Sequence, residues 1–310
     1  MKNIVVAAML FAAAYGLSLW GLSSQGDPGD ALTVLLIYGG ILGGLCWLAT
    51  LRPAPFPLDL PQPGRQLALM LVLILLLILW LCYGVSAFNA FMPASIMGDP
   101  RSKLLLKLAE KLLVFVAIPW LLFRHLFGAT SADFGLSRDK IRALGGRVGL
   151  AALGLSIVVM GINLVIGEAA APIRNGEIPV ITLAVAFPLC FLWNLLEVGL
   201  VEEFFFRALL QTRLAAVFRS QAIGAVTMAI LFGLFHAPGL VLRGAAAFEG
   251  MSEAPGPLYA MAYSVAIMGV AGIPFAILWA RSRNLWLVMI VHAANDTVAY
   301  LPDFIDIWIK

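Results

Sequence analysis

Long apolar segments, each close to the length of a membrane-spanning helix, follow one another along this chain. About 20 apolar residues cross the hydrocarbon core of a bilayer. Such segments cross as helices because a backbone in lipid must satisfy its own hydrogen bonds. The sequence therefore predicts an all-α polytopic membrane protein with about eight to nine crossings, at roughly Asn3–Leu22, Ala31–Leu51, Leu67–Phe91, Leu104–Phe127, Val148–Ile166, Pro179–Ala215, Gln221–Ala237, Leu258–Ala280 and Leu285–Leu301.

The composition agrees with a membrane protein and argues against other classes. Of the 310 residues, 62% are hydrophobic and 12% are charged, whereas a soluble domain carries about 25% charged residues. The net charge of +3 is small and spread between the spans, so we expect no nucleic-acid partner. Cys46, Cys82 and Cys190 lie in apolar segments without a CxxC pair, which indicates packing rather than a disulfide framework.

Basic and acidic loops alternate along the chain. The loop before the fifth segment is strongly basic, with Arg124, Arg138, Lys140, Arg142 and Arg147, whereas the next loop is mixed. Because basic loops stay in the cytoplasm, we expect a cytoplasmic N-terminus and a C-terminus on the outside. The expected localisation is an integral multi-pass protein of a bacterial inner membrane.

Three charged residues interrupt the long sixth segment at Glu202, Glu203 and Arg207. A charged residue at the centre of a membrane helix costs about 2.5–3.5 kcal/mol, so a cluster of three calls for an explanation. Glu203 and Arg207 are four residues apart and share a helix face, which predicts an ion pair. Glu202 is rotated by about 100° from Glu203 and lies outside that pair. The alternative is a solvated loop between two spans.

Two histidines lie in apolar segments of the second half, at His236 and His292. Asp296 follows His292 by four residues and shares its helix face. A lone buried histidine is often only a satisfied core residue. Glu202 and His236, however, lie about 16 and 17 residues on either side of the turn near 218–219, which places them at matched depth on consecutive helices. We therefore expect a polar catalytic cavity between helices of the C-terminal half.

The residue types in this cluster are typical of hydrolysis. A glutamate beside a histidine can take a proton from water, and a second histidine with Asn or Asp can donate hydrogen bonds to an oxyanion. Alternatively, Glu202, His236 and His292 can hold Zn²⁺ with a water in the open position. The motifs HExxH and GxSxG are absent, as is a pair of intramembrane aspartates.

Together the residues Glu202-Glu203-xxx-Arg207, Phe232-xxx-His236 and His292-xxx-Asp296 resemble the three ordered motifs of the CPBP family. That family comprises the type II CAAX prenyl proteases and the bacteriocin-processing or self-immunity membrane proteins, also called Abi. The resemblance covers roughly residues 148–301. The segment Asp133-Phe134-Gly135-Leu136 is similar to one often seen ahead of this region.

The resemblance implies an intramembrane endopeptidase acting on a peptide or membrane-anchored protein in the lipid bilayer. It implies that Glu202 and His236 activate the water, that His292 and Asp296 stabilise the oxyanion or position the substrate, and that Glu203 and Arg207 form a structural pair. We expect no cofactor, with zinc as the alternative. Asp296 departs from the family, where Asn is common, so it orients His292 or is protonated. Ala208, which follows Arg207 of the first motif, is a second departure, because the family often has Gly at this position.

The remaining expectations concern the rest of the chain. Residues 1–130 are predicted to be an N-terminal transmembrane region of about four helices, and residues 145–305 the protease core. Phe232, Asn295 and Glu197 can line the cavity. For Glu197 a structural role is the more favoured expectation. We expect the aromatic run 204–206 to form a surface that faces lipid and packs against neighbouring helices. Lys107, Glu110 and Lys111 are expected to form a self-paired, snorkelling face.

Two other classes of function compete with a protease. A non-catalytic scaffold or immunity factor would keep these motifs for packing. A proton-coupled transporter would use Glu and His as a relay, although no repeated half is visible in the sequence.

Overall fold

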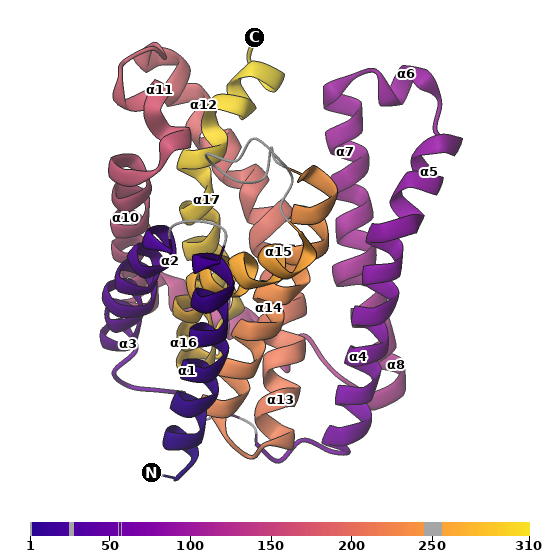
Figure 1. Ribbon diagram of the computed structural model, residues 1–310, viewed down its shortest axis with the longest axis vertical. Coiled ribbons are helices and arrows are strands. Elements are labelled where there is room, and N and C mark those ends of the chain that lie inside the picture. Colours follow the sequence, from indigo (N-terminus) through magenta and orange to yellow (C-terminus); the bar gives the residue numbers. More distant parts are fainter. Residues whose placement is uncertain (1, 25–27, 55, 57, 245–255) are drawn as a thin grey trace. The chain divides into compact units, whose positions relative to one another are not determined.

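The computed structural model describes the whole chain except residues 1, 25–27, 55, 57 and 245–255. Every secondary-structure element within the described residues is helical (Figure 1). The chain divides into two compact units, and each of them is built from two separate stretches of sequence. The all-α architecture predicted from the apolar segments is thus confirmed.

The first unit contains Met1–Phe88 and Leu209–Arg283. Within it, α14 packs against α1, α13, α15 and α16. Its elements are α1 (Lys2–Ser23), α2 (Gly29–Val34), η1 (Leu35–Leu42), α3 (Gly43–Ala49), α4 (Pro63–Leu79), η2 (Trp80–Gly84), α13 (Thr212–Val217), α14 (Gln221–Arg243), α15 (Pro257–Ser264), η9 (Val265–Gly269) and α16 (Ile273–Ser282). Helix α5 (Val85–Phe91) runs across the boundary between the units.

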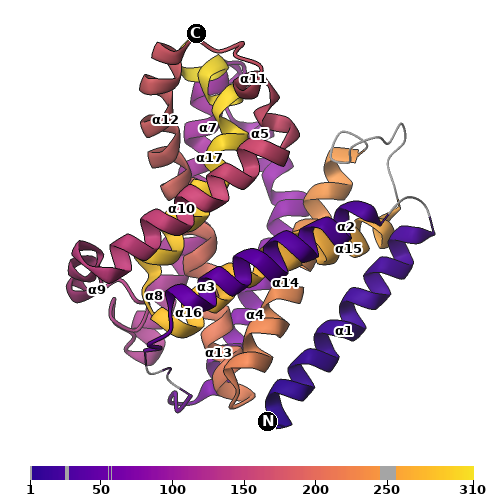
Figure 2. The same cartoon turned by 90° about the vertical axis from the view of Figure 1, so that its left-hand side faces the viewer.

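The second unit contains Asn89–Ala208 and Asn284–Lys310. Its central helix is α17 (Leu285–Trp308), which packs against α10, α12 and η6 (Figures 1 and 2). Its other elements are α6 (Ala94–Met97), α7 (Pro100–Lys111), η3 (Leu112–Ala117), α8 (Ile118–Phe127), α9 (Arg138–Arg142), η4 (Ala143–Gly145), α10 (Arg147–Ile166), η5 (Glu168–Ala170), α11 (Ala171–Arg174), α12 (Val180–Asn194), η6 (Leu195–Leu200) and most of η7 (Glu203–Gln211).

Length and composition identify six membrane-spanning candidates among the described helices, or seven if the bent pair Pro257–Gly269 and Ile273–Ser282 is one span. The sequence predicted eight to nine crossings. The difference lies in α7 to α8, which carries Lys107, Glu110, Lys111 and Arg124, and in α17, whose polar residues lower its hydropathy. The long sixth segment forms one continuous helix, Val180–Val217.

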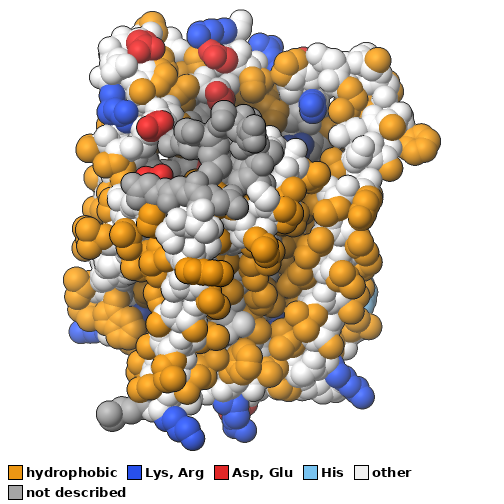
Figure 3. Space-filling view, in the orientation of Figure 1, with side chains coloured by type: hydrophobic (Ala, Val, Ile, Leu, Met, Phe, Trp, Pro, Cys, Tyr) orange, Lys and Arg blue, Asp and Glu red, His pale blue; other side chains and the backbone are white. Residues whose placement is uncertain are grey.

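Exposed hydrophobic side chains cover helices that are candidates for contact with lipid. On α4, large apolar residues point outward, and the space-filling view shows a mostly hydrophobic surface there (Figure 3). These residues are Leu71, Val72, Leu75, Leu76 and Leu79. Outward apolar faces on long helices are what a bilayer requires. The protein is therefore an integral, multi-pass membrane protein.

The start of α17 is anchored by a set of hydrogen bonds. The side chain of Asn284 caps the helix, because its Oδ1 accepts the Leu287 N–H at 3.3 Å. Its Nδ2 also donates to the Lys140 carbonyl at 2.9 Å. The Leu285 N–H donates to the Gly135 carbonyl at 3.2 Å. These bonds hold the first turn of α17 against α9 and the loop before it.

The predicted division at residues 1–130 and 145–305 follows the order of the chain, whereas the compact units interleave distant stretches of sequence. The functional assignment of those two regions stays a prediction.

Candidate functional site

Glu203 lies at the centre of a buried polar cluster in the second unit. Its side chain is fully buried, and its Oε2 lies 3.2 Å from Nε of Arg207, one turn later in η7. Its Oε1 lies 2.6 Å from Nδ1 of His292 on α17. One carboxylate thus serves both a guanidinium on its own helix and an imidazole on another helix.

The pair between Glu203 and Arg207 has the spacing that the sequence indicated, and the structure adds His292 to it. The sequence had given Glu203 only a structural role and had grouped His292 with Asp296. Helical spacing reports neighbours on one helix. The contact between Glu203 and His292 joins residues 89 positions apart, and only helix packing creates it.

The helix that carries Glu202 and Glu203 is π-helical before Glu202, in η6, and again from Glu203 onward, in η7. Such i→i+5 stretches often occur at functional sites. Gly199 in η6 lies so close to α17 that a Cβ at this position would be 2.8 Å from the Met289 carbonyl oxygen. This close approach brings Glu203 within hydrogen-bonding distance of His292.

Glu202 is half-buried, and within the described residues it takes part in no hydrogen bond or ion pair. Its charge acts on Arg207, His292 and Asp296. The carboxylate therefore lies at the edge of the polar cluster with its lone pairs available to a water molecule. This separation of Glu202 from its paired neighbour is the one that the helical spacing indicated.

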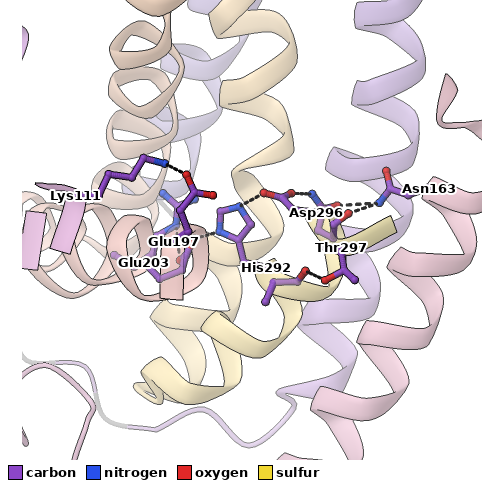
Figure 4. A network of polar contacts seen from close by, with 10 residues as sticks. Lys111, Asn163, Glu197, Glu203, His292, Asp296 and Thr297 are labelled. Carbon is purple, nitrogen blue, oxygen red and sulfur yellow. Dashed lines mark hydrogen bonds and ion pairs between the residues drawn. The ribbon is translucent and has the colours of Figure 1, made fainter. Parts of the chain in front are cut away.

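A chain of polar contacts continues from His292 along α17 and on to α10 (Figure 4). Asp296 Oδ2 is 3.9 Å from His292 Nε2. The Asn295 Nδ2 donates to Asp296 Oδ1 at 2.7 Å, and Asn163 Nδ2 on α10 donates to Asn295 Oδ1 at 3.2 Å. Sequence reasoning missed Asn163. An asparagine inside an otherwise apolar span was the signal that could have found it.

Glu197 has a structural partner that the sequence did not identify. Its buried carboxylate accepts a hydrogen bond from Lys111 Nζ at 2.6 Å, and Lys107 Nζ lies 3.7 Å from the same oxygen (Figure 4). The two lysines of the predicted self-paired face, Lys107 and Lys111, thus also pair with Glu197 on another helix. A buried carboxylate needs a counter-charge, and α7 packs against η6 closely enough to supply it.

His236 belongs to α14 in the first unit. Its Nδ1 lies 2.7 Å from the carbonyl oxygen of Phe232. A carbonyl can only accept, so Nδ1 carries the proton and Nε2 keeps the lone pair of the neutral ring. The buried Phe232 ring contacts the imidazole edge-on, with 4.6 Å between the centroids. The predicted meeting of Glu202 with His236 stays a prediction.

The aromatic run 204–206 is buried rather than exposed to lipid, so that part of the prediction is wrong. Phe204 packs against Trp120 at 6.0 Å and against Phe134 at 5.1 Å between ring centroids. Phe134 belongs to the segment 133–136 that resembled one seen in the family. These contacts pack Phe204 of η7 against α8 and the loop that follows it.

Within the part of the chain that the structure describes, no three His, Cys, Asp or Glu side chains lie together as metal ligands do. His292 Nδ1 is already engaged by Glu203. We derive no chemical step through a metal. The zinc alternative stays a prediction for metal analysis.

The comparison with known families gives one match. Residues 184–298 match the family described as type II CAAX prenyl endopeptidase Rce1-like. The matched stretch includes Glu202, Glu203, Arg207, His236 and His292, and it also includes Asp296. No curated protein and no solved structure matches the chain.

Proposed function

The chain belongs, through residues 184–298, to the type II CAAX prenyl endopeptidase Rce1-like family, and on that premise we propose that it hydrolyses a peptide bond with water activated by Glu202. The family makes the protein a CAAX-protease-like intramembrane endopeptidase whose substrate is a peptide at the bilayer. The glutamic mechanism is our proposal. The half-buried Glu202 beside the Glu203–His292 pair supports it most directly.

In this proposal Glu202 is the general base. Its carboxylate takes a proton from water, and the resulting hydroxide attacks the scissile carbonyl carbon. The C–N bond of the tetrahedral intermediate then breaks, and the proton on Glu202 passes to the departing amine. In the tautomer whose Nδ1 donates to Phe232, His236 has a lone pair on Nε2, and this nitrogen is the expected second base for the same water.

His292 provides the positive charge for the oxyanion. Its Nδ1 donates to Glu203, and its Nε2 faces Asp296. An imidazole between two carboxylates is favoured as the imidazolium, which donates from both nitrogens. At 3.9 Å, the distance between Nε2 and Asp296 is longer than a hydrogen bond. We therefore propose that the Nε2 proton is donated to the developing oxyanion.

Asp296 orients His292 in this scheme and is not itself an oxyanion donor. An ionised carboxylate only accepts hydrogen bonds. Asp296 Oδ1 accepts a hydrogen bond from the Asn295 amide, so this oxygen is already used as an acceptor. An Asp at this position can therefore perform the orienting role that remained open from the sequence, whereas direct donation would require a protonated acid.

The substrate follows from the family description and is also a proposal. The matched family is described as a type II CAAX prenyl endopeptidase, and this description suggests prenylated CAAX peptides as candidate substrates. A first substrate set consists of membrane-anchored peptides, prenylated and unprenylated, with otherwise identical sequences. If cleavage requires the prenyl group, this protein shares the prenylated substrate class that the family description names.

The central test compares wild type with Glu202→Gln and Glu168→Gln in detergent at matched melting temperature. Glu168 is exposed in η5, so its variant removes a carboxylate without touching the cluster. We expect Glu202→Gln to lower kcat by about 10²–10⁴-fold, the usual contribution of a general base, and Glu168→Gln to match wild type. New peptide termini are read by mass spectrometry, and metal content is measured on the same samples.

Full activity of Glu202→Gln would contradict the proposal. Stoichiometric zinc in an active wild type, lost together with activity on chelation, would replace the glutamic mechanism by a metal-dependent one. If the wild type cleaves no peptide and the Glu202→Gln variant keeps the biological effect of the wild type in cells, the results would favour a non-catalytic scaffold or immunity factor.

A further inference from the structure

Asn163 lies on α10, upstream of the residues that match the family, and points toward the polar residues of α17 (Figure 4). Its Nδ2 has three acceptors nearby. These are the Val159 carbonyl at 3.0 Å, the Asn295 carbonyl at 3.1 Å and Asn295 Oδ1 at 3.2 Å. Through these bonds α10, which packs along α17, contacts the polar residues of the site.

These acceptors determine how both amides are oriented. Two of the groups around Asn163 Nδ2 are backbone carbonyls, which accept and never donate. The atom facing them must therefore be the NH₂ group of Asn163 and not its oxygen. It follows that the side-chain atom of Asn295 that faces Asn163 is its oxygen. The NH₂ group of Asn295 is then directed at Asp296 Oδ1, 2.7 Å away.

We infer that Asn163 is a positioning residue for His292, acting through Asn295 and Asp296; this inference rests on the proposed function. With its Oδ1 held by the Asn295 amide, Asp296 presents Oδ2 toward His292 Nε2. Glu203 holds Nδ1 of the same ring. The imidazole is thereby held at Nδ1 by Glu203 of η7, and its Nε2 faces the carboxylate that α10 positions through Asn163.

A purely structural role is the alternative, since interhelical asparagine contacts also hold membrane helices together. The two roles differ in what they change at His292. If Asn163 only joins helices, its loss lowers stability and leaves the imidazole as it was. If Asn163 orients the Asn295 amide, its loss allows that amide to rotate. The Asp296 carboxylate is then held differently, and its electrostatic effect on His292 changes. The charged groups that act on Asp296 are His292, Glu202 and Glu197.

The test uses Asn163→Leu, which removes the donors at similar volume and remains compatible with a membrane span. Ser156→Ala is the matched control, because Ser156 is a buried polar residue on the same helix. The chain has three histidines, so histidine-selective ¹³C labelling gives a simple spectrum, with His292 assigned from His292→Gln. The His292 signal is followed through a pH titration in detergent.

We expect Asn163→Leu to move the His292 titration midpoint by about half a pH unit or more, while Ser156→Ala superimposes on wild type. In the cleavage assay, kcat of Asn163→Leu should fall about 10- to 100-fold with little change in KM. The double variant Asn163→Leu/Asn295→Ala should be no worse than Asn295→Ala alone, because Asn163 acts through Asn295.

An unchanged His292 titration in folded Asn163→Leu would overturn the inference, as would additive effects in the double variant. The titration does not require activity. A shifted His292 signal in a protein that cleaves nothing would keep the positioning role and reject the proposed function, so the two failures are distinguishable. If Asn163→Leu does not fold, the same measurements are made on Asn163→Ser, which keeps a small polar side chain.

Discussion

At the scale of single residues, Glu203 is the most constrained group in the site, because its buried carboxylate faces both Arg207 and His292. Burying a charge is expensive, and breaking a buried pair leaves the remaining charge uncompensated. The pair therefore does more than neutralise two charges: it also holds the histidine that Glu203 contacts. Its removal should affect stability and catalysis together.

We predict that Arg207→Met lowers stability by about 3–5 kcal/mol, the cost of leaving a buried charge unpaired. The control is Lys310→Met, which breaks an exposed pair with Asp306 at the same i,i+4 spacing. Exposed pairs contribute about 0–1 kcal/mol. Thermal unfolding of both variants in one detergent measures the difference. Equal shifts in melting temperature would argue against a buried Arg207–Glu203 pair.

At the scale of elements, the contact between η6 and α17 sets the distance between Glu203 and His292. Gly199 permits that contact because it has no Cβ. The same helix pair carries the catalytic candidates a few residues further on. We therefore expect a displacement at Gly199 to change the distance between Glu203 and His292.

We predict that Gly199→Ala lowers kcat by about tenfold or more, because a displacement of less than 1 Å is enough to misplace reacting groups. Gly154→Ala on α10 is the control, since a Cβ at this position meets nothing within 4 Å. That control should keep its activity and gain slightly in stability from the better helix propensity of Ala. Wild-type kcat in a folded Gly199→Ala variant would show that the close approach does not matter.

At the scale of the whole molecule, the orientation in the membrane follows from the loop charges. The loop before α10 is basic and the loop after it is mixed. Since basic loops remain in the cytoplasm, we expect the two ends of α10 to lie on opposite sides of the bilayer. The N-terminus would then be cytoplasmic.

We test this orientation with single cysteines in a background in which Cys46, Cys82 and Cys190 are replaced by Ala. Ser131→Cys lies in the basic loop and Glu177→Cys in the mixed one, and both positions are exposed. An impermeant maleimide should label Glu177→Cys in right-side-out spheroplasts and Ser131→Cys only after lysis. The reverse pattern would invert the proposed orientation.

Local properties of the chain were sufficient for a large part of this description. Hydropathy over about 20 residues determines whether a helix can cross a bilayer, so the membrane class and the helical architecture could be predicted. Residues four apart share a helix face in α- and π-helices alike, so the pair between Glu203 and Arg207 could also be predicted. The order of the three motifs was enough to indicate the family, which the match to residues 184–298 confirms.

The contacts that build the site join residues far apart in the chain, and these only the tertiary structure decided. Glu203 meets His292 across 89 positions, Lys111 meets Glu197 across 86, and Asn163 meets Asn295 across 132. No local pattern encodes such pairs, because they depend on which faces of η6, α7, α10 and α17 pack together. The sequence by itself determined that buried polar groups would need partners; helix packing selected the partners.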